Sequence, residues 1–244
     1  MIPNSKGLQL SAVLHEPKEK TKTVVVVTHG FVSSKERQRY IALADALNEK
    51  GIALLRFDFG GCGHSDTREI TLSAQVDDLQ SVIAFAQETK GYKKIGVLGE
   101  SLGALTALMS FDEKIQALAL WAPTTAPSDF GDFPDEILAA LSQKGLYIKT
   151  REDGSSYVVP EQYYNELCDF SPAELLGNVT VPVLIVHGEA DTKESIENSE
   201  RAITMLPKWS RLERIENEGY GTHTMTEDME TVITVTVDWF VMNL

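Results

Sequence analysis

The sequence has few cysteines, a deficit of basic residues and no long apolar run. Only Cys62 and Cys168 are present among 244 residues, too few for the disulfide framework of a small secreted domain. The 22 basic and 36 acidic side chains give a formal net charge of −14, which would repel a nucleic-acid backbone. No segment approaches the roughly 18 consecutive apolar residues that span a bilayer, and signal-peptide and metal-binding signatures are also missing. We therefore expect a cytoplasmic protein without nucleic-acid partner, metal or cofactor.

The residues that are present indicate one large globular domain. With 43% hydrophobic and 24% charged residues, the chain can bury a sizeable core. Short apolar runs, typical of strands buried on both faces of a parallel sheet, occur at 24–27, 52–57, 95–98, 117–121 and 183–186. Helical spacing of apolar residues predicts helices over 37–50, ended by Gly51, and over about 72–86. Because strands and helices alternate, we predict an α/β fold with a doubly wound, mostly parallel sheet.

Two regions depart from this alternation. The tail, 226–244, fits either a strand or a helix, and we favour a helix because a closing segment of this length could cover one face of the sheet. Residues 124–178 show no strand–helix unit, although Asp153-Gly154 between two apolar runs predicts a hairpin. A structureless loop this long is uncommon in a compact domain. We predict an inserted lid over 124–178, on a core made of 1–123 and 179–244; the alternative is an ordinary surface excursion.

The strongest motif is Gly99-Glu100-Ser101-Leu102-Gly103. It lies between the predicted strand 95–98 and a good helix start. A serine at such a turn needs small neighbours, because its backbone is strained and closely packed. The turn lifts the hydroxyl clear of the sheet and aims the following helix N-terminus at a developing oxyanion. The motif predicts that Ser101 is a nucleophile; the alternative is a glycine-lined turn with an incidental serine.

A serine nucleophile needs a general base, and the chain has five histidines. His223 lies in a glycine-containing turn after a predicted strand, 211–215. Such a turn can place an imidazole over the carboxyl edge of the sheet, where ligands bind in open α/β folds. We predict His223 as the base. Structural or merely exposed positions are expected for the other four, His15, His29, His64 and His187.

The base in turn needs a group that orients it and stabilises its charged form. Asp191 follows the predicted strand 183–186 and is our prediction for this acid. Glu189 is the nearest competitor and Glu194 a weaker one. Because acidic residues are plentiful in this chain, an unpaired surface carboxylate is the alternative.

The order of Ser101, Asp191 and His223 is the serine, acid, histidine order of α/β-hydrolases. Apart from the predicted lid, the chain resembles an α/β-hydrolase-fold serine esterase along nearly its whole length. The elbow pentapeptide carries this resemblance together with His29-Gly30-Phe31, Arg56-Phe57-Asp58-Phe59-Gly60-Gly61-Cys62-Gly63-His64-Ser65-Asp66 and His187-Gly188-Glu189-Ala190-Asp191. The resemblance implies a nucleophile, base and acid at the three positions named above. It also implies an oxyanion hole made of the backbone N–H groups of Phe31 and Leu102, and acyl transfer without a cofactor or metal.

The substrate is less well defined, and the sequence leaves the oligomeric state open. In size, single lid and lid composition the chain is similar to bacterial cinnamoyl (feruloyl) esterases, which implies small aromatic or acyl esters. The aromatic residues of 124–178 would suit an apolar pocket wall, but they would equally suit packing of the lid onto the core. A monoacylglycerol-lipase-like enzyme would prefer fatty acyl groups instead.

Two further alternatives concern the type of protein. A serine aminopeptidase would need a lid carboxylate to hold the substrate amine, and four are available: Asp129, Asp132, Asp135 and Glu136. A non-catalytic ligand-binding protein on a hydrolase scaffold would have no need of the nucleophile. The intact serine, acid and histidine set therefore argues against pure binding.

Overall fold

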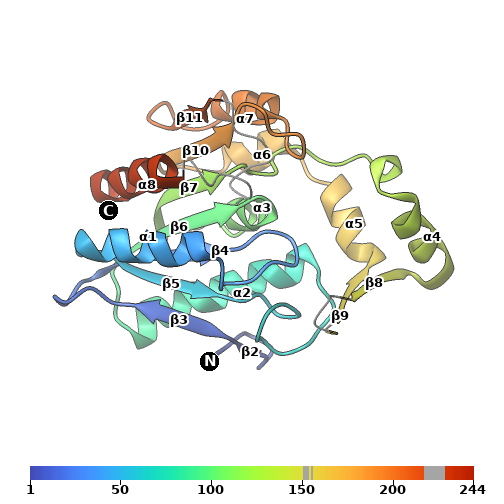
Figure 1. Cartoon of the computed structure of the whole chain (residues 1–244), viewed down its shortest axis with the longest axis horizontal. Helices are drawn as coiled ribbons and strands as arrows, with labels where there is room; N and C mark the ends of the chain where they lie inside the picture. Colours follow the sequence, from blue (N-terminus) through green and yellow to red (C-terminus); the bar gives the residue numbers. More distant parts are fainter. Residues whose placement is uncertain (151–153, 155, 217–228) are drawn as a thin grey trace.

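A seven-stranded sheet forms the centre of the molecule (Figure 1). The computed structural model describes residues 1–150, 154, 156–216 and 229–244. The strand order across the sheet is β11-β10-β7-β6-β4-β5-β3. Only the edge strand β3 runs antiparallel to its neighbour, and the other pairs are parallel. The strands are β3 (Ala12–His15), β4 (Thr23–Thr28), β5 (Ala53–Phe57), β6 (Lys94–Glu100), β7 (Ile115–Trp121), β10 (Val183–Gly188) and β11 (Arg211–Ile215).

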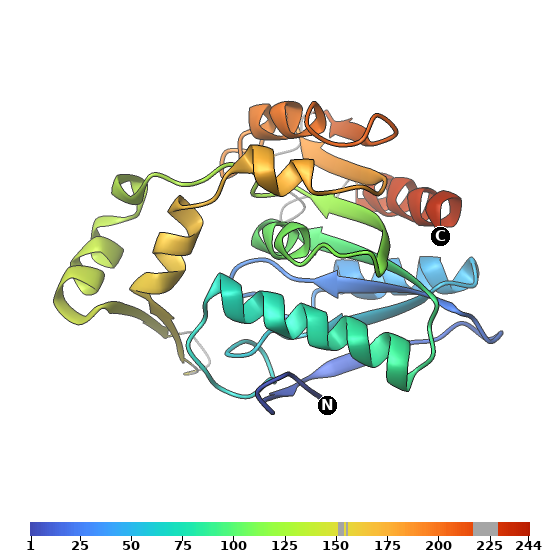
Figure 2. The same ribbon diagram turned by 180° about the vertical axis from the view of Figure 1, so that it is seen from behind.

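Helices cover both faces of this sheet. Helices α1 (Gln38–Glu49) and α8 (Met229–Asn243) lie on one face, and α2 (Leu72–Ala84) and α3 (Leu102–Met109) lie on the other (Figures 1 and 2). Each face has its own hydrophobic cluster: Val24 and Val26 of β4 belong to one, whereas Val25 and Val27 belong to the other. This division follows from the alternation of side chains along a strand. The predicted doubly wound sheet is thus confirmed.

The predicted elements are largely present. All five apolar runs are strands, and β11 confirms the strand predicted at 211–215. Gly51, with a φ of 76°, follows the end of α1, as predicted. The tail is the helix α8 rather than a strand, and Val232, Thr236 and Phe240 are buried on one side of it. Outside 124–178, the elements without a sequence prediction include the edge strand β3, the small sheet of β1 (Ile2–Pro3) and β2 (Gln9–Leu10), helix α7 (Ile196–Ile203), and the π-helical turn Phe85–Thr89.

The segment 124–178 has its own secondary structure and extends to one side of the sheet (Figures 1 and 2). It contains a 3-10 turn (Phe130–Asp132), α4 (Asp135–Lys144), β8 (Leu146–Thr150), β9 (Ser156–Pro160), α5 (Glu161–Cys168) and α6 (Pro172–Gly177). Strands β8 and β9 pair antiparallel, which confirms the predicted hairpin. Asp153 lies outside the described residues, and Gly154 has a φ of 82°.

Side chains and a few hydrogen bonds attach this segment to the sheet domain. The backbone N–H of Ile70 donates to the carbonyl of Val158 in β9 at 2.9 Å. All seven aromatic rings of the segment belong to, or pack against, the hydrophobic cluster on the α2 and α3 face: Phe130, Phe133, Tyr147, Tyr157, Tyr163, Tyr164 and Phe170. Packing therefore accounts for much of the aromatic content of 124–178. None of the helices in the described ranges is long and apolar enough to cross a membrane.

Candidate active site

Ser101 lies in a sharp turn between the end of β6 and the start of α3. Its backbone has φ 52° and ψ −120°, a conformation that non-glycine residues rarely adopt. The N–H of Ser101 donates to the carbonyl of Trp121 at 2.9 Å, and 9% of the residue is exposed. Backbone strain of this kind costs about 1–3 kcal/mol and persists only where the surroundings hold it in place. The turn therefore depends on its neighbours.

The two glycines of the motif have direct geometric reasons to be glycine. A Cβ on Gly99 would lie 2.5 Å from the Cα of Ala104, and a Cβ on Gly103 would lie 2.4 Å from the carbonyl oxygen of Thr28. Both distances are shorter than atoms in contact tolerate. Helix α3 is thus pressed directly against the ends of β4 and β6, and only residues without a side chain fit there.

The loop after β4 lies against the nucleophile. A Cβ on Gly30 would lie 3.5 Å from the Cβ of Ser101, which brings the next residue, Phe31, to the same edge of the sheet. Val32 has a φ of 44°, a strained value for a β-branched residue. Leu102 is the first residue of α3, and the first N–H groups of a helix have no intrahelical acceptor. The two predicted oxyanion donors, Phe31 and Leu102, thus belong to the two segments that flank Ser101.

The loop after β10, called the acid loop here, contains the two competing carboxylates of Asp191 and Glu189, which differ in burial. The side chain of Asp191 is fully buried, and its Oδ1 accepts hydrogen bonds from the backbone N–H groups of Lys193 at 2.8 Å and Glu194 at 3.0 Å. Glu189 is exposed. A carboxylate fixed by two backbone donors is better suited to orient another group than one that moves freely in solvent.

Glu194 is a second, largely buried carboxyl in this loop. The Thr124 hydroxyl donates to it, and the backbone N–H of Thr124 donates to the carbonyl of Ser101 at 3.4 Å. Burial raises the pKa of the Glu194 carboxyl; the Thr124 hydrogen bond opposes this shift, and the neighbouring Asp191 charge adds to it. The sequence placed Glu194 as a weak competitor of Asp191. In the structure it connects the acid loop to the segment after β7.

His187 also lies beside Asp191, with Nε2 3.4 Å from Oδ2. The ring is fully buried. Its Nδ1 lies 2.7 Å from the Ser199 hydroxyl and its Nε2 lies 3.0 Å from the carbonyl of Glu194. Both ring nitrogens are thus engaged with the protein, in agreement with the predicted structural role.

The predicted base, His223, lies outside the described residues. Three of the other histidines have partners elsewhere. Nε2 of the buried His29 accepts from the backbone N–H of Phe59 at 3.2 Å. His15 accepts from Nε of Arg56 at 2.8 Å, and burial followed by the Arg56 charge lowers the pKa of this imidazole. The side chain of His64 is 73% exposed, and its Nδ1 lies 3.3 Å from Nζ of Lys35.

Glu100, the residue before the proposed nucleophile, was not among the predicted site residues. Its carboxylate is buried, with 1% of the side chain exposed. It accepts from Nε of Arg39 at 2.9 Å, from the other end of the same guanidinium at 2.6 Å, and from the Tyr40 hydroxyl at 2.5 Å. The sequence does carry a signal for it, because Glu100 is a charged residue at the end of an otherwise apolar strand. A charge buried at such a position must have a partner.

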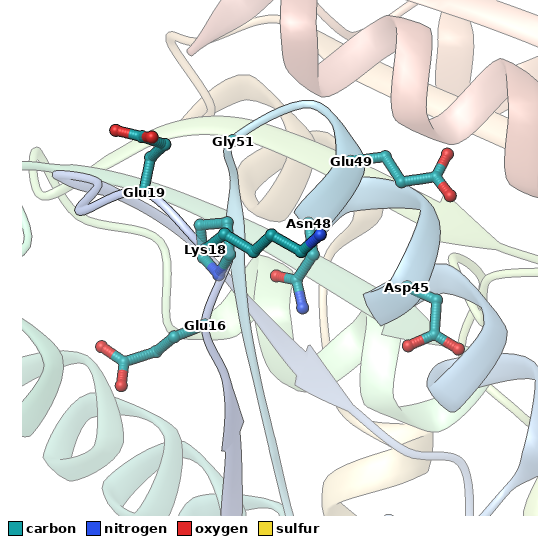
Figure 3. A pocket seen from close by; sticks show the side chains of 8 residues that line it. Glu16, Lys18, Glu19, Asp45, Asn48, Glu49 and Gly51 are labelled. Carbon is teal, nitrogen blue, oxygen red and sulfur yellow. The ribbon is translucent and has the colours of Figure 1, made fainter.

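A separate hollow, with a volume of about 620 Å³, lies at the opposite edge of the sheet. Its lining residues lie after β3 and around the end of α1, next to the start of β5: Glu16, Pro17, Lys18, Glu19, Asp45, Asn48, Glu49 and Gly51. In Figure 3 the carboxylates of Glu16 and Glu19 point away from those of Asp45 and Glu49. Among the described residues, no group of three or more His, Cys, Asp or Glu side chains is placed to hold a metal ion.

Known proteins match both the sequence and the fold. A family profile described as serine aminopeptidase, S33, matches residues 19–155, more than half of the chain. Esterase EstD of Thermotoga maritima is 24% identical over 176 residues, which cover 65% of this chain and 42% of that protein. The mitochondrial palmitoyl-protein thioesterase ABHD10 of Rattus norvegicus is 26% identical over 177 residues, which cover 68% of this chain and 58% of that protein. The chain thus spans about half the length of these two relatives.

Solved structures match over the whole chain. Est1E of Butyrivibrio proteoclasticus, in a structure with ferulic acid bound, has a TM-score of 0.82 at 23% identity, covering 100% of this chain and 98% of that one. A monoacylglycerol lipase of Paleococcus ferrophilus has a TM-score of 0.78 at 19% identity, covering 97% and 100%. At these identities the likeness shows a shared fold.

Proposed function

Since the chain belongs to the α/β-hydrolase family described as serine aminopeptidase, S33, we propose that it is a serine hydrolase that cleaves carboxylic esters through an acyl-enzyme. The observation that carries this proposal is the strained turn at Ser101, with a φ of 52° and two glycines that no other residue can replace without a clash. Strain of this kind is typical of functional sites. A serine in an ordinary turn would not require it.

In the proposed reaction Ser101 attacks the ester carbonyl while His223 takes the hydroxyl proton. The tetrahedral intermediate collapses when His223 protonates the departing alcohol, and water, activated by the same imidazole, then releases the acid. Asp191 orients the imidazole. The backbone N–H groups of Phe31 and Leu102 stabilise the oxyanion, and each such donor contributes about 2.7–4 kcal/mol to the transition state.

We propose small aromatic or acyl esters, such as cinnamoyl or feruloyl esters, as substrates, and 124–178 as a lid on the core of 1–123 and 179–244. The exposed ring of Phe31 supports this, because it stacks on Tyr163 of α5 at a centroid distance of 5.1 Å and meets the edge of Tyr157 at 6.4 Å. Aromatic rings of the segment thus border the loop that carries a proposed oxyanion donor. The Est1E structure holds ferulic acid in the same fold. The fold match to a monoacylglycerol lipase favours fatty acyl esters as the second candidate.

Aminopeptidase activity fits the described residues less well. The carboxylate of Asp129 accepts from the backbone N–H of Gly131 at 2.9 Å, and that of Glu136 accepts from the Tyr147 hydroxyl at 3.0 Å. Asp135 is exposed in the first turn of α4, where an acidic side chain is favoured by the helix dipole. Because these groups serve local structure, we favour an ester over an amine-bearing substrate.

The test is hydrolysis of short nitrophenyl esters by Ser101→Ala. We expect a loss of at least about 1,000-fold in kcat, because oxyanion stabilisation and binding alone leave only a small remnant of catalysis. Ser110→Ala is the matched control: Ser110 is another buried serine, at the C-terminal end of α3, and its hydroxyl has no hydrogen-bond partner within the described part of the chain. Activity that persists unchanged in Ser101→Ala would sink the proposal.

A second pair of variants tests the acid. Asp191→Asn should lower kcat strongly, whereas Glu189→Gln, in the same loop, should leave it nearly unchanged. A panel of methyl ferulate, medium-chain esters, monoacylglycerols and aminoacyl amides then separates the substrate classes. Equal and feeble turnover of the whole panel would contradict both proposed ester classes.

We also propose a cytoplasmic location. The chain has only two cysteines, Cys62 and Cys168, a number typical of proteins in a reducing compartment. Cell fractionation tests this: recovery of the protein outside the cytoplasm, with its two thiols oxidised, would contradict it.

A further inference from the structure

We infer that Arg39, Tyr40 and Glu100 form a cluster of positioning residues that holds the peptide of Ser101 in its strained conformation. The inference rests on the proposed function, because it concerns the geometry of the proposed nucleophile. None of the three side chains needs to touch the substrate. Their effect passes through the backbone, since Glu100 is joined directly to Ser101.

The carboxylate of Glu100 is held by several hydrogen bonds. Glu100 is buried, and it accepts two hydrogen bonds from the Arg39 guanidinium and one from the Tyr40 hydroxyl. Charge-assisted and bidentate hydrogen bonds are the strong, directional ones. The side chain of Glu100 is therefore fixed in position, and its backbone, which continues into the turn, is fixed with it.

Tyr40 also holds the other side of the same turn. Its ring stacks on Trp121 with a centroid distance of 6.4 Å and an interplanar angle of 28°. The carbonyl of Trp121 accepts the N–H of Ser101, and Glu100 and Trp121 are direct neighbours across β6 and β7. One fully buried tyrosine thus contacts both the residue before the nucleophile and the residue that accepts its N–H.

The charges within this cluster complement one another. Arg39 lies in the first turn of α1, where a helix dipole disfavours a cation, and this turn has no acidic residue of its own. Glu100 supplies the missing negative charge from the neighbouring strand. Burial, and then the Glu100 charge, raises the pKa of Tyr40 well above its usual range, so that the phenol remains a donor at all physiological pH values.

The chain contains a matched pair for comparison at the other end of β6. Tyr92, two residues before this strand, is 4% exposed, and its hydroxyl donates to the Glu16 carboxylate at 3.3 Å. The chemical pair is the same as that of Tyr40 and Glu100. The two pairs lie at different ends of β6: Tyr92 precedes the first residue of the strand, whereas Ser101 follows its last residue. Tyr92→Phe therefore reports the loss of a tyrosine–carboxylate hydrogen bond away from the nucleophile.

The experiment compares Tyr40→Phe, Glu100→Gln and Tyr92→Phe with the wild-type chain. We measure kcat and KM for a nitrophenyl ester, the rate constant for phosphonylation of Ser101 by a fluorophosphonate, the pH profile and the melting temperature. A misplaced nucleophile loses up to about 100-fold in rate, so we expect kcat and the phosphonylation rate to fall about 10-fold in Tyr40→Phe and about 10- to 100-fold in Glu100→Gln. The KM should stay within about twofold and the pH profile should keep its shape, as geometric misplacement predicts. Tyr92→Phe should keep the wild-type rates.

Each outcome decides something. If Tyr40→Phe lowers the melting temperature as Tyr92→Phe does but keeps the wild-type kcat and phosphonylation rate, the cluster is only structural and the inference is wrong. Tyr40→Phe removes only one hydroxyl group. It can therefore be compared with Tyr92→Phe even if Glu100→Gln fails to fold. A wild-type chain that is not phosphonylated at Ser101 would overturn the proposed function and the inference together. If the wild-type chain is phosphonylated at Ser101 but Tyr40→Phe and Glu100→Gln keep the wild-type rates, the inference alone is overturned.

Discussion

The turn around Ser101 and the segment 124–178 are attached to the same sheet by different kinds of contact. At the turn, backbone meets backbone: the Cβ of an alanine at Gly103 would lie 2.4 Å from the carbonyl oxygen of Thr28. Beyond its first residue, Thr124, whose backbone N–H donates to the carbonyl of Ser101, the segment is attached mainly through apolar side chains. A backbone hydrogen bond from Ile70 and the carboxylate of Glu166 in α5 add to this attachment. Side chains can adjust to a substitution, whereas a backbone cannot withdraw without moving a strand.

In the proposed enzyme, the turn would set the conditions for chemistry and the segment 124–178 would set the conditions for substrate choice. The turn must hold a strained serine in one position, so it allows almost no variation. A segment anchored by side chains can change its sequence, and with it the surface it offers to a ligand, while the sheet stays intact. The comparison predicts that equivalent substitutions have very different effects in the two regions.

The largest effect should come from Gly103→Ala, compared with Gly177→Ala at the end of α6. The added methyl group at Gly103 meets the backbone of β4, and we expect the free energy of unfolding to fall by about 3 kcal/mol, with loss of the proposed esterase activity. A Cβ at Gly177 has nothing within 4 Å and no positive φ to strain it. We expect Gly177→Ala to change stability by less than about 1 kcal/mol, in the stabilising direction.

Urea unfolding followed by circular dichroism measures both variants. If Gly103→Ala and Gly177→Ala lower the free energy of unfolding by similar amounts, the segment tolerates an added methyl group no better than the turn does. That result would contradict the comparison. A stable and fully active Gly103→Ala would mean that β4 and α3 can separate at little cost.

The turn was predictable from sequence because five consecutive residues between a buried strand and a helix start carry its motif. The clash at Gly99 is local, with Ala104, whereas the clash at Gly103 is with Thr28 of β4, 75 residues earlier in the chain. The partners of Glu100 were not predictable. Arg39 and Tyr40 precede it by about 60 residues, and only the order of strands in the sheet brings α1 beside the end of β6.

The segment and the acid loop show the same limit. The hairpin of β8 and β9 was predictable from its Asp-Gly turn, whereas α4 and α5 are only 10 and 8 residues long, so that an apolar period repeats too few times to predict a helix. Asp191 and Glu189 are two residues apart in one loop, and spacing cannot choose between them. The distinction appears only when the backbone N–H groups of Lys193 and Glu194 turn inward to bind Asp191.

A smaller effect is expected from Glu166→Gln, which weakens the attachment of the segment. The carboxylate of Glu166 accepts from the backbone N–H of Leu72 at 2.6 Å and from the Ser73 hydroxyl at 2.8 Å, at the N-terminus of α2. Loss of its charge there should lower the free energy of unfolding by about 1 kcal/mol. Limited proteolysis should cut the segment sooner, while kcat for a small ester should change little.

Glu161→Gln in the same helix is the control, because Glu161 is exposed and its change should leave the rate of proteolysis at the wild-type value. Proteolysis of Glu166→Gln at the wild-type rate would show that the aromatic contacts alone hold the segment. If kcat falls together with the faster proteolysis, the attachment of the segment also affects the chemical step. That result would contradict the distinction between the turn and the segment.

The smallest effect is expected at the junction of the two regions, where Glu194 accepts from Thr124 and Thr124 donates to the carbonyl of Ser101. The folded state raises the pKa of Glu194 above its ordinary value of 4.5. Between 4.5 and the raised pKa, the folded chain keeps a proton that the unfolded chain releases, so stability falls as the pH rises through this window.

Glu194→Gln removes the titration. Its melting temperature should therefore improve relative to the wild type as the pH rises from about 4.5 towards neutrality. Glu197→Gln, an exposed change in α7, should show a constant difference over the same range. If the Glu194→Gln difference is constant as well, the junction does not hold a proton on folding, and the hydrogen bond to Thr124 links the turn and the segment without any dependence on pH.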